Sequence, residues 1–89
     1  MHIEIHHKKA NHTGRHPDHY ELVALFFLDK ADLHGKEAYN IAYEVMQKPN
    51  QYWLNKKINF RPTAVGDMIS VDGKKVLVGQ FSFEPAIFK

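Results

Sequence analysis

The chain has 89 residues, which is enough for one hydrophobic core and too few for two domains. Its hydrophobic fraction of 44% and charged fraction of 25% are ordinary globular values, which argue against a disordered or fibrous protein. A formal net charge of +2 does not demand a nucleic-acid ligand, and the absence of cysteine excludes disulfides, thiolate metal sites and a cysteine nucleophile. We therefore expect a single domain over residues 1–89.

The N-terminal residues predict a strand. Ile3 and Ile5 alternate with polar residues over 2–7, which is the period of a strand with one buried face. No apolar stretch of the signal-peptide type occurs there, and the longest apolar run, 22–28, is far shorter than the roughly 20 residues that span a bilayer. These features favour a cytoplasmic protein.

A long polar loop and a second strand follow. Residues 8–18 contain a glycine and a proline among polar residues, which predicts a loop. Residues 19–28 are rich in β-forming residues and almost continuously apolar. This pattern predicts a strand in the core, either covered on both faces or at a sheet edge against a helix.

One amphipathic helix is predicted over about 35–47. Its apolar positions recur at the spacing of a single helical face: Ala38, Ile41, Ala42, Val45 and Met46. Pro49 ends the helix because the residue before a proline avoids helical geometry.

The remaining chain predicts an irregular connection and a closing hairpin. Residues 48–62 show neither helical nor strand period, whereas 68–71 and 75–83 are strand-like. Asp72-Gly73 between them predicts a two-residue turn in which both residues have positive φ. The sequence thus predicts an α+β fold, with one amphipathic helix packed on a mainly antiparallel sheet of about four strands in the order β-β-α-β-β.

A family resemblance runs over about residues 19–84. It is carried by 38–43 (AYNIAY), Trp53, 61–69 (RPTAVGDMI), 76–78 (VLV) and 81–83 (FSF). These segments resemble small uncharacterised proteins of phages and other mobile elements, in which a strand and a helix precede an R-S-x-S-V-G-D-V-I segment, a Y-x-V strand and a closing G-F. Pro62, Ala64 and Ser82 depart from that pattern. The resemblance implies an α+β fold and a mobile-element origin, which favours a protein that binds a host factor, and it carries over no catalytic residue.

Histidines are concentrated near the N-terminus, where six of the seven lie in the first nineteen positions. Imidazole is the commonest side-chain metal ligand, so one hypothesis is a zinc or nickel site made by His12, His16, Asp18 and His19. The alternative is that these are polar residues facing solvent. No nucleophile motif and no phosphate-binding glycine loop accompanies them, so we expect no enzymatic activity and no cofactor.

Two further surfaces are candidates for binding. Tyr, Trp and Arg dominate interface hot spots, which makes a partner-binding surface of Tyr39, Tyr43, Tyr52 and Trp53 a hypothesis. The alternative is that these rings close the rim of a small core. Basic residues beside aromatic rings can also bind nucleic acid, and here they are Lys56, Lys57 and Arg61.

Apolar residues near the C-terminus make a homodimer a further hypothesis. Phe81 and Phe83 are predicted on one strand face, and Ile87 and Phe88 follow. If these side chains are not docked within one chain, a second subunit can cover them. The leading hypothesis remains a non-enzymatic protein that binds a host protein, with a nucleic-acid-binding module and a histidine-rich metal-binding protein as alternatives.

Overall fold

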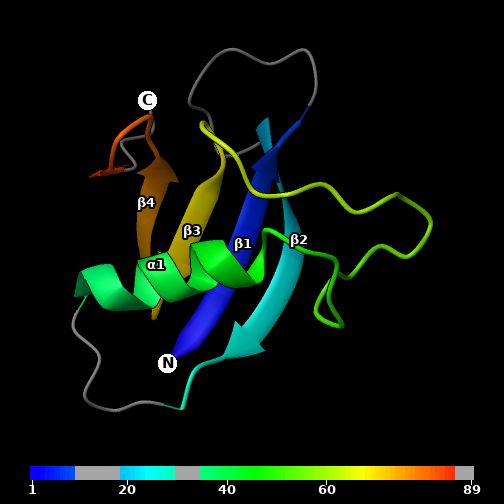
Figure 1. The fold of residues 1–89 in the computed structure, drawn as a ribbon, viewed down its shortest axis with the longest axis horizontal. Helices are drawn as coiled ribbons and strands as arrows, with labels where there is room; N and C mark the ends of the chain where they lie inside the picture. Colours follow the sequence, from blue (N-terminus) through cyan, green and yellow to red (C-terminus); the bar gives the residue numbers. More distant parts are fainter. Residues whose placement is uncertain (10–18, 30–34, 86–89) are drawn as a thin grey trace.

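The protein folds as an antiparallel sheet with a helix on one face (Figure 1). A computed structural model describes residues 1–9, 19–29 and 35–85. In chain order the elements are β1 (His2–Lys8), β2 (Tyr20–Phe27), α1 (Gly35–Val45), β3 (Met68–Val71), β4 (Lys74–Val78) and β5 (Phe83–Pro85). The strand order is β2-β1-β3-β4-β5, and every neighbouring pair is antiparallel. The predicted α+β class is confirmed, with five strands in place of about four.

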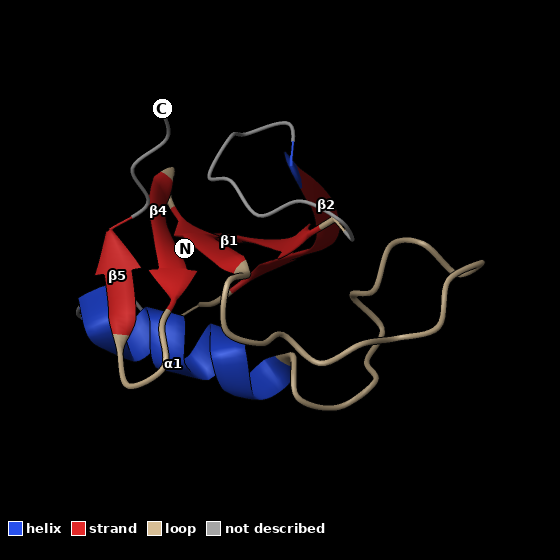
Figure 2. Cartoon of the chain, turned by 90° about the horizontal axis from the view of Figure 1, so that it is seen from above, coloured by secondary structure: helices blue, strands red, loops and turns tan. Residues whose placement is uncertain are grey.

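The core lies between the sheet and α1. Ile3 and Ile5 of β1 and Ile69 of β3 are completely buried there, together with Ala38 and Ala42 of the helix. Figure 2 shows α1 lying along one side of the sheet. The small alanine side chains let the helix backbone approach the strands, and the branched isoleucines fill the space between.

The buried stripe of the helix differs slightly from the predicted one. Ala38, Ala42 and Met46 are fully buried as expected, whereas Ile41 and Val45 are half-buried. Tyr39 is buried in their place, and its hydroxyl donates a hydrogen bond to the Lys74 carbonyl at 2.7 Å. The helix is therefore turned toward the side of Tyr39, because that hydroxyl has an acceptor at the end of β4.

Strand β2 is the edge of the sheet and not a strand covered on both faces. It pairs with β1 along its length, and among the described residues its outer side has only an isolated bridge between Ala24 and Trp53. Only part of it is buried: Val23, Ala24 and Phe26 lie in the core, and Tyr20 is buried in a smaller cluster with Met68 and Leu77. The prediction of a strand was correct, and of its two alternatives the edge position is the observed one.

The closing hairpin forms as predicted between β3 and β4. Asp72 and Gly73 have φ angles of 48° and 87°, so both turn residues are in the left-handed region. The predicted strand over 75–83 is wrong in extent, because β4 ends at Val78 and a turn precedes β5. In that turn the Gly79 amide donates to the Ser82 carbonyl at 2.9 Å.

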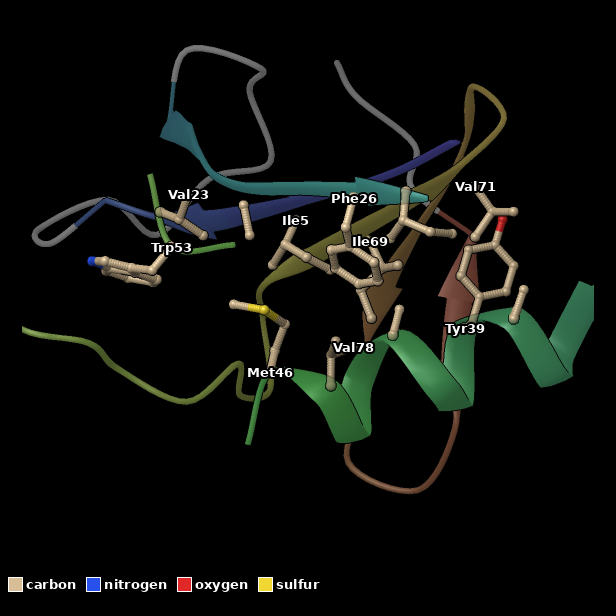
Figure 3. Packing of buried hydrophobic residues seen from close by; sticks show 13 residues of the cluster. Ile5, Val23, Phe26, Tyr39, Met46, Trp53, Ile69, Val71 and Val78 are labelled. Atoms are coloured by element: carbon tan, nitrogen blue, oxygen red, sulfur yellow. The ribbon is translucent and has the colours of Figure 1, made fainter. Parts of the chain in front are cut away.

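The long connection from α1 to β3 is irregular, as expected, and is held by single contacts. The Thr63 amide donates to the Met46 carbonyl at 3.1 Å, and the Leu54 amide donates to the Val23 carbonyl at 2.9 Å. The Trp53 indole nitrogen donates to the Ile58 carbonyl at 3.0 Å. These bonds hold Trp53 at one end of the core, at the opposite end from Tyr39 (Figure 3).

Candidate functional site

The sheet face away from α1 carries exposed apolar side chains on β2. They are Leu22, Leu25 and Phe27, with exposed fractions of 41%, 37% and 70%, and we call them the β2 strip. Their cross-strand partners on β1 are His6, Glu4 and His2, which lie between the buried residues of that strand. Opposed side chains on paired strands share a face. The β2 strip therefore lies on the face opposite the helix.

A β-bulge brings the three residues of the strip onto one face. The register shifts between Ile5 and His6, so that Ile5 faces Ala24 while His6 faces Leu22, and Val23 is the extra residue. In a regular strand, residues 22 and 25 would point to opposite faces because side chains alternate. This bulge is what the sequence did not reveal, and without it the strip could not be predicted.

Beside the strip lies a row of polar side chains on β1, made by His2, Glu4 and His6. His2 Nε2 lies 2.9 Å from one Glu4 carboxylate oxygen, and His6 Nε2 lies 3.1 Å from the other. The hydrogen bond from His2, more than that from His6, lowers the pKa of Glu4. The His2 ring also meets Phe27 edge to face, with ring centroids 5.2 Å apart. The row therefore borders the strip with one carboxylate and two imidazoles.

A second polar group, buried except for its arginine, lies at the junction of β1 with the loop before β3. This Asp67 cluster comprises His7, Arg61, Thr63 and Asp67. Asp67 accepts two hydrogen bonds from the Arg61 guanidinium, at 2.8 and 3.0 Å. It also accepts from the amides of Lys8 at 2.9 Å and Ala64 at 2.8 Å. The carboxylate thus fastens the loop to β1 with four donors.

His7 is held neutral in this cluster. Its side chain is nearly inaccessible, and burial lowers its pKa to about 4 even though Asp67 opposes the shift. Its Nε2 atom hydrogen-bonds the Thr63 hydroxyl at 2.9 Å and lies 3.9 Å from Asp67. In a catalytic triad the hydroxyl and the carboxylate approach opposite ring nitrogens. Here both approach Nε2, and Thr63 is buried, so the arrangement fits a structural tie and not an activated nucleophile.

The aromatic residues proposed as a partner surface fall into two separate groups. Tyr39 and Tyr43 both contact the Phe83 ring, whereas Tyr52 stacks on Phe26 with centroids 4.8 Å apart. Trp53 is 7% exposed and contacts the rings of His7 and Phe60. Tyr39 and Trp53 are core residues, and Tyr43 and Tyr52 are half-buried. The four rings therefore do not make one exposed surface, because the small core needs them as filling.

The proposed basic residues lie on the irregular loop. Lys56 and Lys57 are exposed, while Arg61 is half-exposed and bound to Asp67. A cleft of about 400 Å³ next to them is lined by basic Lys8, Lys9 and Arg61, by acidic Glu21 and by Trp53 among others. The cleft therefore carries a modest excess of positive charge at its rim.

Only one of the four proposed metal ligands, His19, lies in the described part of the chain. His12, His16 and Asp18 lie outside the described residues. His19 directly precedes β2, and its carbonyl accepts a hydrogen bond from the Lys9 amide at 2.7 Å. Over residues 1–9, 19–29 and 35–85, no three histidine, aspartate or glutamate side chains come together as a metal site. Over the same residues no helix has the length and apolar character needed to cross a membrane.

Comparison with known proteins adds no relative. No protein-family model, no curated protein and no solved structure matches the chain. A function therefore has to be argued from the exposed surfaces described above.

Proposed function

We propose that this is a non-enzymatic binding protein that attaches to a host protein through the β2 strip. The observation that carries the proposal is Phe27, a large aromatic side chain left 70% exposed at the end of strand β2. Leu22 and Leu25 extend the same patch. Contiguous apolar patches on a small protein often mark interaction sites, since exposing them in isolation is unfavourable.

The surroundings of the strip support a protein partner. An interface core is typically apolar, and its rim is polar. The strip has this arrangement, because Glu4 and the two histidines of its row lie along one side. On the other side β2 is the edge strand, where the described residues add only the bridge at Ala24. A host protein as partner follows from the resemblance to phage and mobile-element proteins.

The test compares proteins captured from a bacterial lysate by the wild-type chain and by Phe27→Thr. Threonine keeps the strand propensity of the position and removes the aromatic surface. We expect at least one protein to be retained by the wild type and lost from the variant, and to bind the purified wild type directly. Identical captured sets would contradict the proposal.

A matched control is Phe81→Ala. Phe81 is also an exposed phenylalanine, but it lies between β4 and β5 at the other edge of the sheet. This variant should retain the same partner as the wild type. Loss of the partner from both variants would indicate nonspecific adhesion to exposed phenylalanine and would reject the β2 strip.

A nucleic-acid ligand is the second candidate, favoured by Lys8, Lys9 and Arg61 around one cleft and by Lys56 and Lys57 on the adjoining loop. Phosphate binding by these residues predicts an affinity for oligonucleotides that falls steeply with salt. Trp53 is too deeply buried to stack on a base. Titration of labelled single- and double-stranded oligonucleotides at low salt measures this affinity, and the absence of binding there would reject the candidate.

A further inference from the structure

A second exposed aromatic residue lies at the opposite edge of the sheet. Phe81 is 93% exposed, more than any other large apolar side chain in the described part of the chain. It sits at the tip of the turn between β4 and β5, in which the Gly79 amide donates to the Ser82 carbonyl at 2.9 Å. The turn therefore displays the ring to solvent on a closed, hydrogen-bonded loop.

Only glycine fits at the start of this turn. A Cβ atom at position 79 would lie 2.3 Å from the Ser82 carbonyl oxygen, which is a backbone atom that cannot move aside cheaply. Glycine allows this close approach because it has no side chain. The observed turn, with the exposed Phe81 at its tip, therefore requires glycine at position 79.

A pocket lies directly beside the Phe81 ring. Its volume is about 240 Å³, and its walls include Asn40 and Tyr43 of α1, Val65, Phe83 and the turn residues 79–82. Small-molecule sites usually measure roughly 300–1,000 Å³, so this pocket is better matched to a single side chain. The half-buried rings of Tyr43 and Phe83 offer an aromatic wall to such a side chain.

The projecting Phe81 side chain and the pocket beside it suit a two-fold interface. In an isologous dimer the same patch faces itself, so a projecting residue and its receiving pocket must both belong to that patch. Phe81 and the pocket satisfy this condition. None of the pocket residues is charged, so facing copies meet no like-charge repulsion from the lining.

We propose that two copies of this chain associate by placing Phe81 of each in the pocket beside Phe81 of the other. The β2 strip stays free in such a dimer, because β2 and the β4–β5 turn lie at opposite edges of the sheet. The patch comprises the nine residues that line the pocket, fewer than the roughly 20–30 residues per side of a standard interface. We therefore expect weak association, with a dissociation constant of roughly micromolar to submillimolar order.

Sedimentation velocity from about 10 µM to about 1 mM measures the association, a range that corresponds to weak binding. The wild type should shift from monomer to dimer, and Phe81→Ala should raise the dissociation constant at least about tenfold, as expected for a central aromatic anchor. Because Phe81 is almost fully exposed, this variant should keep its circular dichroism spectrum and melting temperature. A wild type that stays monomeric throughout would overturn the proposal.

Asn40→Lys tests the receiving pocket independently. Asn40 is exposed on α1, so lysine is tolerated there, yet it places an ammonium group at the pocket wall in both copies. This variant should weaken the dimer about as much as Phe81→Ala, whereas Phe27→Thr should leave it unchanged. A dimer that is indifferent to Phe81→Ala or to Asn40→Lys, or that is lost in Phe27→Thr, would show a different interface and overturn the proposal.

Discussion

The two faces of the sheet have different compositions, and β1 contributes to both. Toward α1 it presents Ile3 and Ile5, which no solvent reaches, and then His7 inside a buried polar cluster. On the opposite face it presents His2, Glu4 and His6, which remain partly exposed. Alternation along one strand thus separates residues that stabilise the fold from residues that can meet a partner.

The same division runs through β2, where it is less regular. Phe26 is buried against Tyr52, whereas the next residue, Phe27, is mostly exposed. Two adjacent phenylalanines therefore have opposite roles. A large apolar residue is evidence of the core only when the face on which it lies is known.

The largest expected effect on the free energy of unfolding comes from substituting the buried member of this pair, and the exposed member is its control. Phe26→Thr removes a ring from the core and should reduce the free energy of unfolding by about 3–4 kcal/mol. Phe27→Thr should change it by about 0.5 kcal/mol or less, because the ring is mostly in solvent already. Urea denaturation followed by fluorescence measures both values. Equal losses would mean that the two faces are not distinct.

The buried carboxylate of Asp67 should contribute the next largest amount. Asp67→Asn removes the charge from a group that accepts four hydrogen bonds and leaves Arg61 without its counterion. The free energy of unfolding should fall by about 2–3 kcal/mol. The matched control is Asp72→Asn in the β3–β4 turn, where asparagine also tolerates positive φ. The free energy of unfolding of that control should stay within about 0.5 kcal/mol of the wild-type value.

The acid sensitivity of the fold should depend on His7. Its pKa is about 4 in the folded protein and 6.5 in the unfolded chain. Between these values the unfolded chain binds a proton that the folded protein does not, so stability falls as the pH drops from 6.5 to about 4. The loss from this residue should approach about 3 kcal/mol, which follows from the size of the shift.

His7→Gln isolates that contribution. Glutamine retains a hydrogen-bonding group near Thr63 and does not titrate. The variant should be less stable than the wild type at pH 7 and should lose less stability between pH 6.5 and 4, as measured by urea denaturation at each pH. If the free energy of unfolding fell equally with pH in the two proteins, a neutral, buried His7 would be contradicted.

Much of the fold that produces these two faces could be predicted from the sequence. The alternation around Ile3 and Ile5 predicted β1, the helical spacing from Ala38 to Met46 predicted α1, and Asp72-Gly73 predicted the hairpin. Each of these signals is local, because it depends on residues close together in the chain. The confirmed parts of the fold are those that local patterns determine.

The candidate surface was not predictable because it depends on pairing between distant segments. The bulge at Val23 places Leu22 and Leu25 on one face, and it becomes visible only when β2 is aligned with β1. The ties of Asp67 to Lys8 and of His7 to Thr63 join residues 59 and 56 positions apart. The burial of Tyr39 and Trp53 was not predictable for the same reason, since helix rotation and loop packing decide which rings are buried.

The smallest expected effect is that of Glu4, the carboxylate on the open face. Its two histidine contacts are partly exposed to solvent, and each is an ion pair only when the histidine is protonated, so Glu4→Gln should reduce the free energy of unfolding by only about 0.5 kcal/mol. The lowered pKa of Glu4 means that its contribution is lost as the pH falls through that pKa. Urea denaturation at pH 7 in low and high salt is the measurement, and high salt should shrink the difference between the variant and the wild type. Asp67→Asn should keep most of its effect in the same salt, because the Asp67 side chain is buried and dissolved ions screen its interactions less. If Glu4→Gln were as costly as Asp67→Asn, the row of His2, Glu4 and His6 would be part of the stabilising structure and could not serve as the rim of a binding surface.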